Sequence, residues 1–377
     1  MASLPWKVSR YRCTLTPLSP LHIGTKDPNP ACRYVLPGSG GTGLCLKESF
    51  VVSKLKDGQI SIKDYMEKPF PPGGLPRDKA ELKKVKAYDI EFTKAAKELN
   101  KEARPFIRDG FGRPYIPGSS LKGVLRTGLV FSSLLNDDEK RKELAQDRNI
   151  KDVITMMRSS SKDNIGAIRR RNPARERTIE GLFRSGSGPR PDPKNDILKC
   201  LKISDSLPSS GPLVMAATNI FTSRRGELEN LSRNTPAAFC EVTELEVPFE
   251  FEMTIDEELL ANHMELKPFV KFRDHNDILM ALQDHAKVTA YLEKEYLERN
   301  GREELWDLKF EQEFNDSAII RIGWGSGWSG SSLFPVLAGY SQERVLDRPL
   351  SRKMVINSVG NPQMMLGWAK LTIVPVP

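Results

Sequence analysis

The sequence is poor in the residues that build metal centres and disulfides. Its 377 residues include five cysteines and four histidines. No two cysteines form a Cys-x-x-Cys pair, and the histidines form neither a His-Glu-x-x-His nor a His-x-His arrangement. An odd number of cysteines also argues against a disulfide framework. The sequence therefore predicts no structural disulfide, no metal site and no cofactor.

Long hydrophobic runs are missing as well. No apolar stretch reaches the roughly 20 residues that span a bilayer, and the first residues, Met-Ala-Ser-Leu-Pro-Trp, lack the apolar core of a signal peptide. Hydrophobic residues still make up 39% of the chain, which is ample material for a core. Because neither a membrane-spanning run nor a signal peptide is found, we expect a cytoplasmic protein without membrane contact. A chain of this length also exceeds the usual size of one core. It should have two domains, or one domain with large insertions.

Charge is distributed unevenly along the chain. The net charge is +8, yet residues 241–316 include 21 acidic and 8 basic residues, so the remainder carries +21. Such segregation suits a protein in which one face follows phosphates and another is solvated or meets a partner protein. Residues 162–194 hold nine Lys or Arg among several Gly, Pro and Ser, which predicts a flexible basic loop. Its Arg169, Arg170 and Arg171 are either phosphate ligands or simply solvated cations.

Hydrophobic periodicity predicts strands and helices in irregular alternation. Alternating polar and apolar positions predict strands, and spacings of three and four residues predict helices. The expected strands lie within 11–24, 34–36, 203–207, 213–221, 239–255 and 367–374, with the fifth range forming one strand or a hairpin pair. The expected helices cover 78–104, a segment that starts at Ser119 or Ser120 and passes Leu129, and 277–299. This order, with its long insertions, favours an α+β fold.

Residues 117–126, Pro-Gly-Ser-Ser-Leu-Lys-Gly-Val-Leu-Arg, have the chemistry of an anion site. Gly118, Ser119 and Ser120 open a predicted helix, where backbone N–H groups and the positive end of the helix dipole favour an RNA phosphate. Lys122 and Arg126 are four residues apart, hence on one helical face, and together would clamp consecutive phosphates. The alternative is an ordinary helix capped by a serine, with two solvated cations.

Residues 323–330, Gly-Trp-Gly-Ser-Gly-Trp-Ser-Gly, form a glycine-rich loop. No Gly-Lys-Ser/Thr follows it and its spacing is not that of a Rossmann loop, so nucleotide hydrolysis is unsupported. Glycines let a backbone approach a ligand closely, and Trp324 or Trp328 would pack under a base or sugar of single-stranded RNA. The alternative is that both tryptophans face the core. The candidate RNA ligands of this loop are Gly323, Gly325, Ser326 and Gly327.

Two isolated residues are candidates for catalysis. His22 would act as a general base for attack by a ribose 2′-hydroxyl, and Asp205 as an acid–base or metal-binding carboxylate. Neither has an identifiable partner in the sequence. The alternatives are a hydrogen-bonded histidine beside a turn and a carboxylate that caps a turn or strand end.

Taken in order, these segments resemble the RAMP superfamily of CRISPR proteins. Residues 115–126 match its Pro-Gly-Ser-Ser-x-Lys-Gly-x-x-Arg signature, residues 18–24 read Leu-Ser-Pro-Leu-His-Ile-Gly, and the glycine-rich loop lies near the C-terminus. Within the superfamily, residues 203–206, 321–328 and 366–371 look most like the subfamily that supplies the fifth subunit of type III-A (Csm) effector complexes. That subunit caps the complex at the 3′ end of the guide RNA.

The resemblance implies a fold and a set of neighbours. The fold would be two RRM-like (ferredoxin-like) modules with long insertions, which we divide into residues 1–200 and 201–377. RNA contact would come from the 118–126 segment, the glycine-rich loop and His22. The neighbours would be guide RNA (crRNA), target RNA and Csm backbone subunits, without direct DNA contact. Cleavage in such complexes is attributed to an aspartate of the backbone subunit, and Asp109 and Asp205 are its nearest positional candidates here.

We therefore expect a non-catalytic, guide-RNA-binding subunit that caps the 3′ end of the crRNA and aids its maturation and assembly. One alternative is a metal-independent endoribonuclease of the same superfamily with His22 as its base, and another is a different RAMP subunit of a type III complex. A third is a purely structural cap, in which the acidic segment 241–316 faces a partner or recruits a host nuclease.

Overall fold

The protein combines two β-sheets with helices that cover one of them. The computed structural model describes residues 7–25, 27–38, 41–100, 102–148, 150–151, 178–184, 192–209, 211–231, 237–306, 318–327, 330, 332–338 and 351–377. Within these ranges, strands and helices are mixed along the chain, which confirms the α+β class. No helix in the same ranges is both long enough and apolar enough to cross a bilayer.

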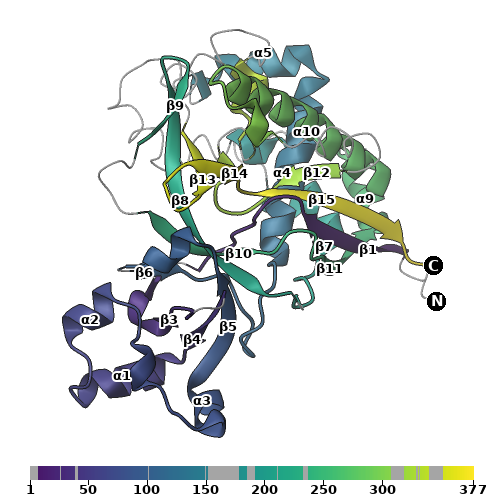
Figure 1. The fold of residues 1–377 in the computed structure, drawn as a ribbon. Helices are drawn as coiled ribbons and strands as arrows, with labels where there is room; N and C mark the ends of the chain where they lie inside the picture. Colours follow the sequence, from purple (N-terminus) through teal and green to yellow (C-terminus); the bar gives the residue numbers. More distant parts are fainter. Residues whose placement is uncertain are drawn as a thin grey trace, which may run out of the picture.

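The first sheet has five antiparallel strands in the order β12-β15-β1-β11-β7. Their bounds are β1 Val8–Pro17, β7 Leu201–Ile203, β11 Phe249–Asp256, β12 Ala318–Arg321 and β15 Trp368–Pro375. In β1, Tyr11, Cys13 and Leu15 are buried and alternate with more exposed residues, as its sequence pattern predicts. The start of β1 and the C-terminal end of β15 lie together at one side of the molecule (Figure 1).

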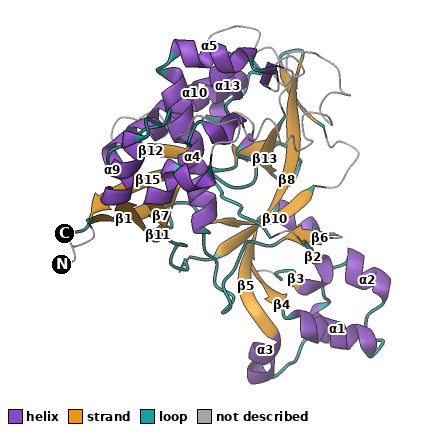
Figure 2. Ribbon diagram, turned by 180° about the vertical axis from the view of Figure 1, so that it is seen from behind, coloured by secondary structure: helices purple, strands orange, loops and turns teal. Residues whose placement is uncertain are grey.

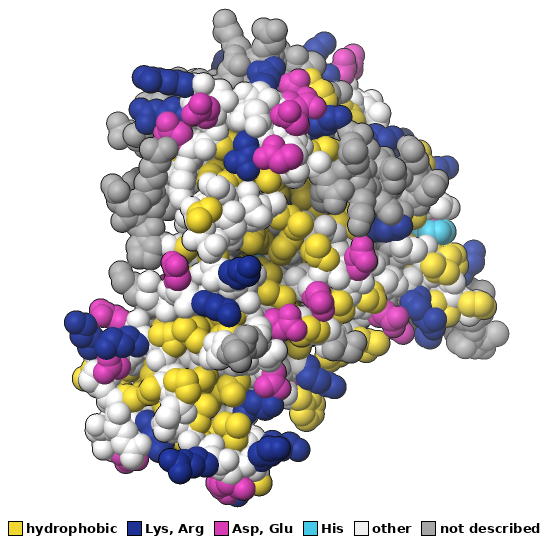
Figure 3. All heavy atoms as spheres, in the orientation of Figure 1, with side chains coloured by type: hydrophobic (Ala, Val, Ile, Leu, Met, Phe, Trp, Pro, Cys, Tyr) yellow, Lys and Arg dark blue, Asp and Glu magenta, His cyan; other side chains and the backbone are white. Residues whose placement is uncertain are grey.

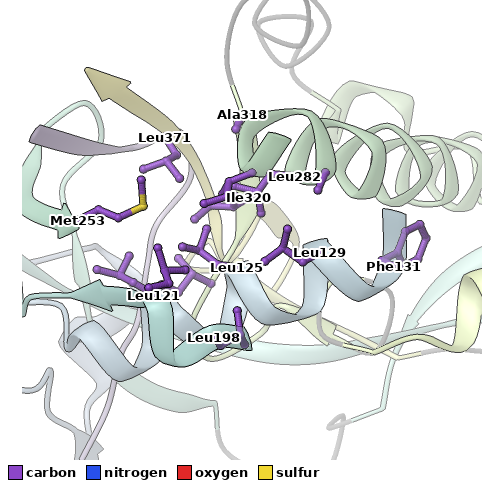
Figure 4. Packing of buried hydrophobic residues seen from close by; sticks show 14 of the residues in the cluster. Leu121, Leu125, Leu129, Phe131, Leu198, Met253, Leu282, Ala318, Ile320 and Leu371 are labelled. Atoms are coloured by element: carbon purple, nitrogen blue, oxygen red, sulfur yellow. The ribbon is translucent and has the colours of Figure 1, made fainter. Parts of the chain in front are cut away.

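Helices cover one face of this first sheet. They are α4 Gly118–Leu135, α9 Glu257–Glu265 and α10 His275–Glu298, and Figure 2 shows all three in front of the sheet. With β1, β7, β11 and β15, the helices α4 and α10 complete the βαββαβ order of a ferredoxin-like motif. Between sheet and helices lies the largest core cluster, to which α4 contributes Leu121, Leu125 and Leu129 at helical spacing (Figure 4).

The second sheet follows the path β2-β6-β10-β8-β5-β4-β3, with β9, β13 and β14 attached to it. Its long strand β8, Leu213–Arg224, pairs with β5, β9, β10 and β13 and is almost entirely buried. The other strands are β2 Asn29–Pro30, β3 Tyr34–Val35, β4 Thr42–Leu46, β5 Lys86–Phe92, β6 Glu102–Arg104, β9 Glu227–Asn230, β10 Ala238–Thr243, β13 Arg352–Ile356 and β14 Pro362–Met365. That this sheet forms a second RRM-like module stays a prediction.

Shorter helices decorate both parts. α1 Glu48–Lys56, α2 Ile62–Glu67 and α3 Lys79–Val85 form a lobe beside β3, β4 and β5 (Figure 1), with a small core of its own. α5 Asp138–Gln146 and α13 Phe334–Ala338 lie near the end of α4. The 3-10 turns are η1 Ala31–Arg33, η2 Pro72–Gly74, η3 Ala95–Glu98, η4 Pro193–Asn195, η5 Ile197–Cys200 and η6 Glu303–Leu305.

Three sequence expectations are corrected by this arrangement. The helix expected over 78–104 is wrong: α3 ends at Val85, and β5 follows at once because β4 and β8 pair with its two edges. The hairpin expected within 239–255 is also wrong, since β10 belongs to the second sheet and β11 to the first. Finally, each sheet takes strands from both sides of residue 200, so the division into 1–200 and 201–377 does not separate the sheets.

A buried ion triad joins the two sheets through α10. The Glu293 carboxylate on α10 accepts from Arg321 Nη1 of β12 at 3.0 Å and from Arg352 Nε of β13 at 2.5 Å. All three side chains are almost wholly buried. Burial lowers the pKa of Arg321 to about 10, although the Glu293 charge opposes the shift. One carboxylate therefore compensates two buried guanidinium groups that come from different sheets.

We expect the substitution Glu293→Gln to lower the free energy of unfolding by about 3–5 kcal/mol, because it leaves two buried cations without their counter-charge. The neighbouring Glu295→Gln is the matched control. Glu295 pairs with Arg299 on the surface of the same helix, so its loss should cost only a few tenths of a kcal/mol. Urea unfolding followed by circular dichroism measures both values. Equal midpoints for the two variants would contradict the role given to Glu293.

Candidate nucleic-acid interface

The start of α4 is organised by Asp205 rather than by a serine. Pro117 occupies the N-cap position of α4, and no side chain at that position caps the helix. The cap expected from Ser119 or Ser120 is therefore wrong. The helix begins one residue earlier than expected, at Gly118, which places both serines inside its first turn. The Asp205 carboxylate accepts from the Gly118 N–H at 2.7 Å. It thereby satisfies one of the helix's free donors.

Gly118 lies directly against the chain that carries Asp205. An added Cβ atom at Gly118 would be 2.5 Å from the Ile203 carbonyl oxygen and 2.7 Å from that of Ser204. Only glycine allows this approach between the helix start and the end of β7. Residues 203–206 and the α4 start are thus fitted to each other, and β7 stops at Ile203 instead of running to 207 as expected.

The two cations of α4 are engaged inside the protein. Lys122 Nζ donates to the backbone carbonyls of Leu198 and Leu201, at 2.8 and 2.7 Å, and burial lowers its pKa. Arg126 lies 3.5 Å from Asp196 and covers the Phe183 ring at 4.0 Å. Both side chains connect α4 to residues 196–201. Lys122 and Arg126 are therefore not a pair of solvated cations. RNA contact by Gly118, Ser119, Ser120, Lys122 and Arg126 stays a prediction.

The glycine-rich loop rests on the segment that holds His22. The Trp324 N–H donates to the His22 carbonyl at 2.7 Å, and a Cβ atom at Gly323 would be 2.5 Å from the same oxygen. Gly323, Gly325 and Gly327 all have positive φ, from 67° to 96°, a conformation that favours glycine. Arg321, from the buried triad, donates to the Gly325 carbonyl at 2.9 Å. Two segments that resemble the superfamily are thereby brought side by side.

His22 is a buried, hydrogen-bonded residue. Its ring is 2% exposed, and its Nδ1 lies 2.7 Å from the Glu241 carbonyl. Burial lowers the pKa of His22, with the Glu241 contact opposing the shift. The ring also lies edge-on to Trp324, with centroids 5.3 Å apart. These contacts favour the structural interpretation of His22 over that of an accessible general base.

The Trp324 ring is covered by cations rather than open to a base. Lys353 Nζ lies 3.3 Å from the ring centroid, and Arg104 Cζ lies 5.2 Å from it. The half-buried ring also packs against a small cluster that includes Cys240 and Leu366. Sequence reasoning missed Arg104 and Lys353, because nothing local marks them and they meet only through the second sheet. Trp328, the second tryptophan of the loop, lies outside the described residues.

The two aspartates proposed as candidates for cleavage have structural partners. Asp109 accepts from the Phe111 and Arg113 N–H groups and pairs with the Arg113 guanidinium, which holds a tight turn and lowers the pKa of Asp109. At its tip, Phe111 is 86% exposed. Asp205 is exposed and bonds the Gly118 N–H. Asp205 matches its capping alternative, and Asp109 is part of a turn.

Other expectations concern loops and metals. Arg169, Arg170 and Arg171 lie outside the described residues. Among the residues that are described, no group of three or more His, Cys, Asp or Glu could hold a metal ion, and all five cysteines are buried and free. On the face shown in Figure 3, the described Lys and Arg side chains are scattered among acidic ones and form no single basic stripe.

Comparison with known proteins places this geometry in a family context. The family model of the RAMP superfamily matches residues 14–329. The CRISPR system Cms protein Csm5 of Methanocaldococcus jannaschii is 25% identical over 296 residues, which cover 75% of this chain and 62% of that protein. The chain therefore spans less than two thirds of that relative. The Csm5 protein of Streptococcus thermophilus is 64% identical over 36 residues, about 10% of this chain and 9% of its own.

Solved structures share the fold. A chain in the cryo-EM structure of a Csm–crRNA–target RNA ternary complex of a type III-A CRISPR–Cas system has a TM-score of 0.64 and 20% identity. That likeness covers 96% of this chain and all of the other. The crystal structure of T. onnurineus Csm5 has a TM-score of 0.59 at 20% identity, over 95% of this chain and 99% of the other.

Two glycines of α4 provide a test of how its start is packed. Gly118→Ala should destabilise the protein by about 1–3 kcal/mol, because the new methyl group would meet backbone oxygens of residues 203 and 204. Gly123→Ala, five residues along, has no atom within 4 Å of its Cβ position and should add about 1 kcal/mol through helix propensity. Thermal unfolding compares the variants. Two shifts of the same sign would show that the helix start is not packed as described.

Proposed function

The chain belongs to the RAMP superfamily, and on this premise we propose that it is a guide-RNA-binding, non-catalytic subunit of a type III-A CRISPR complex. We place it at the 3′ end of the crRNA, where it would aid maturation and assembly. The observation that carries the proposal is the contact between the glycine-rich loop and the segment that holds His22. In this contact the backbone N–H of Trp324 donates to the His22 carbonyl. The fold of this protein is also similar to that of a chain in a Csm–crRNA–target RNA complex.

The chemistry of the chain suits single-stranded RNA. Glycines with positive φ let the loop backbone come close to a sugar-phosphate chain. Outside the acidic segment 241–316 the chain carries +21, and this charge includes the run of three arginines at 169–171. Contacts of this kind bind phosphates without reading bases, so affinity should fall steeply with salt. Target RNA and the Csm backbone subunits are the other expected partners. The acidic segment would face one such subunit or a recruited nuclease.

The geometry of the catalytic candidates supports binding without cleavage. A general base must reach the proton it removes, but the His22 ring is buried and bonded through Nδ1 to a backbone carbonyl. Asp109 is committed to its turn, and Asp205 to the α4 start. None of the three forms a hydrogen bond or ion pair with a second catalytic group. Among the described residues, their side chains bond only to backbone groups and to Arg113.

We expect guide RNA to co-purify with the tagged chain and its neighbouring subunits, and the isolated chain to bind single-stranded RNA in a salt-dependent manner. Replacing Arg169, Arg170 and Arg171 together by Gln should make the negative slope of log affinity against log salt shallower by about 2. This value follows from roughly 0.7 for each lost phosphate contact. A matched triple variant, Lys54→Gln with Lys56→Gln and Lys84→Gln, should keep the wild-type slope. Complexes that assemble with this chain but contain no guide RNA would refute the proposal.

The rival endoribonuclease function makes a separate prediction. Purified protein incubated with repeat-containing RNA in EDTA should yield no product, because the candidate base His22 is buried and bonded to a backbone carbonyl. His22→Gln and the control His263→Gln, which alters another buried histidine, should therefore behave like the wild type in this assay. Cleavage that persists in EDTA, disappears in His22→Gln and remains in His263→Gln would establish the rival function.

A further inference from the structure

Arg104 and Lys353 converge on Trp324 at the base of the glycine-rich loop. Arg104 ends β6, Lys353 lies on β13, and Trp324 follows β12, so three distant segments of chain meet here. Lys353 Nζ is 3.3 Å and Arg104 Cζ 5.2 Å from the centroid of the indole ring. Both cationic side chains are half-buried, as is the tryptophan. The His22 ring lies edge-on to Trp324, with the two ring centroids 5.3 Å apart.

Within the described part of the chain, no carboxylate compensates this pair of cations. Among the ion pairs of the described residues, none involves Arg104 or Lys353. The carboxylate of the nearby Glu241 is already taken up by Arg108, by two tyrosine hydroxyls and by a backbone N–H. Burial lowers the pKa of Lys353 to about 8, and repulsion by Arg104 adds to the shift. Burial also raises the pKa of Cys240 to about 12, so that thiol supplies no negative charge.

Two half-buried like charges without a counter-ion are unfavourable for the protein alone. The electron-rich face of Trp324 offsets part of that cost, by about 0.5–2 kcal/mol for each cation–π contact. Other cations of the interior have polar partners: Arg108 has Glu241, Arg321 and Arg352 share Glu293, and Lys122 donates to two backbone carbonyls. The pair at Trp324 has neither kind of partner among the described residues. Its charge and its partial exposure fit an external anion that would complete the group.

We propose that Arg104 and Lys353, held by the Trp324 ring, form a binding pocket for one backbone phosphate of the RNA strand that passes the glycine-rich loop. The assignment of the strand rests on the proposed function, whereas the anion-binding pocket does not. A guanidinium and an ammonium group together suit a phosphodiester, since the first offers paired donors and the second a point charge. Trp324 is then the platform that positions the cations, and not a surface on which a base stacks.

The pocket implies a pH dependence with a defined sign. The groups that act electrostatically on Lys353 are Arg104, Cys240 and His22. Only protonated Lys353 attracts a phosphate, so affinity is full below its pKa of about 8 and falls as the pH rises above it. A bound phosphate favours the charged form and raises that pKa. Lys353→Gln should remove this pH dependence, and Lys353→Arg should keep the affinity constant into the alkaline range because Arg stays protonated there.

Protection of Lys353 from an amine-reactive ester, read by mass spectrometry on the full chain, tests the pocket directly. Inorganic pyrophosphate should slow the labelling of Lys353 about tenfold at ligand near ten times its Kd. Exposed Lys56 serves as the internal control and should be labelled at an unchanged rate. Arg104→Gln should abolish the protection, and near-UV circular dichroism would verify that this variant keeps the fold. Single-stranded oligouridylate should protect Lys353 in the same way.

The outcomes separate the pocket from the function. If neither pyrophosphate nor oligouridylate protects Lys353 while the RNA still binds, the pocket is wrong and the RNA-binding function stands. If pyrophosphate protects Lys353 but the RNA neither binds nor protects, the pocket is real and the proposed function fails. Equal protection in Arg104→Gln and wild type would also overturn the pocket, since it would place the anion elsewhere.

Discussion

The fold depends on a single buried carboxylate, Glu293, which holds two guanidinium groups from different sheets. Arg321 comes from the edge of the helix-covered sheet, and Arg352 from the strand that pairs with β8 in the other. Because Arg321 also donates to the Gly325 and Leu366 carbonyls, the same charge fixes the shape of the glycine-rich loop. The conformation of the loop therefore depends on the buried ion triad as well as on the glycines of its own sequence.

Glu241 is the buried carboxylate of the second sheet. Glu241 balances the charge of Arg108, as Glu293 balances those of Arg321 and Arg352. Glu241 is fully buried and collects donors from Tyr34, Tyr88 and Arg108, while its own carbonyl accepts from the His22 ring. Interior charge is thus balanced wherever the fold needs it. Arg104 and Lys353, which have no carboxylate partner among the described residues, lie where the glycine-rich loop meets the second sheet. In the proposal made above, a ligand balances their charge there.

Local periodicity predicted those elements whose core face is long. β8 and α10 follow their expected ranges closely, because each is a long segment with many apolar residues. β1 begins at Val8, three residues before its expected range, and ends at Pro17. The segment 86–92 failed, since Tyr88 and Phe92 fit a helical spacing and, together with Ile90, also an alternating one. Pairing with β4 and β8 decided the outcome. The candidate site divides in the same way. His22 and the glycine-rich loop were found from their sequences, whereas Arg104 and Lys353 meet only through sheet pairing that no local pattern encodes.

The segment that best matches the family signature has a physical explanation that does not require a ligand. Gly118 permits the contact with residues 203 and 204, Lys122 donates to two carbonyls of the 198–201 chain, and Arg126 pairs with Asp196. Substituting these residues would loosen α4 from β7 and disturb the first sheet, so lost RNA binding in such variants would not by itself identify an RNA contact. Residues that bind RNA without holding the fold should instead be cations whose side chains have no hydrogen-bond or ion-pair partner in the described part of the chain. Arg104 and Lys353 meet that criterion, and Lys122 and Arg126 do not.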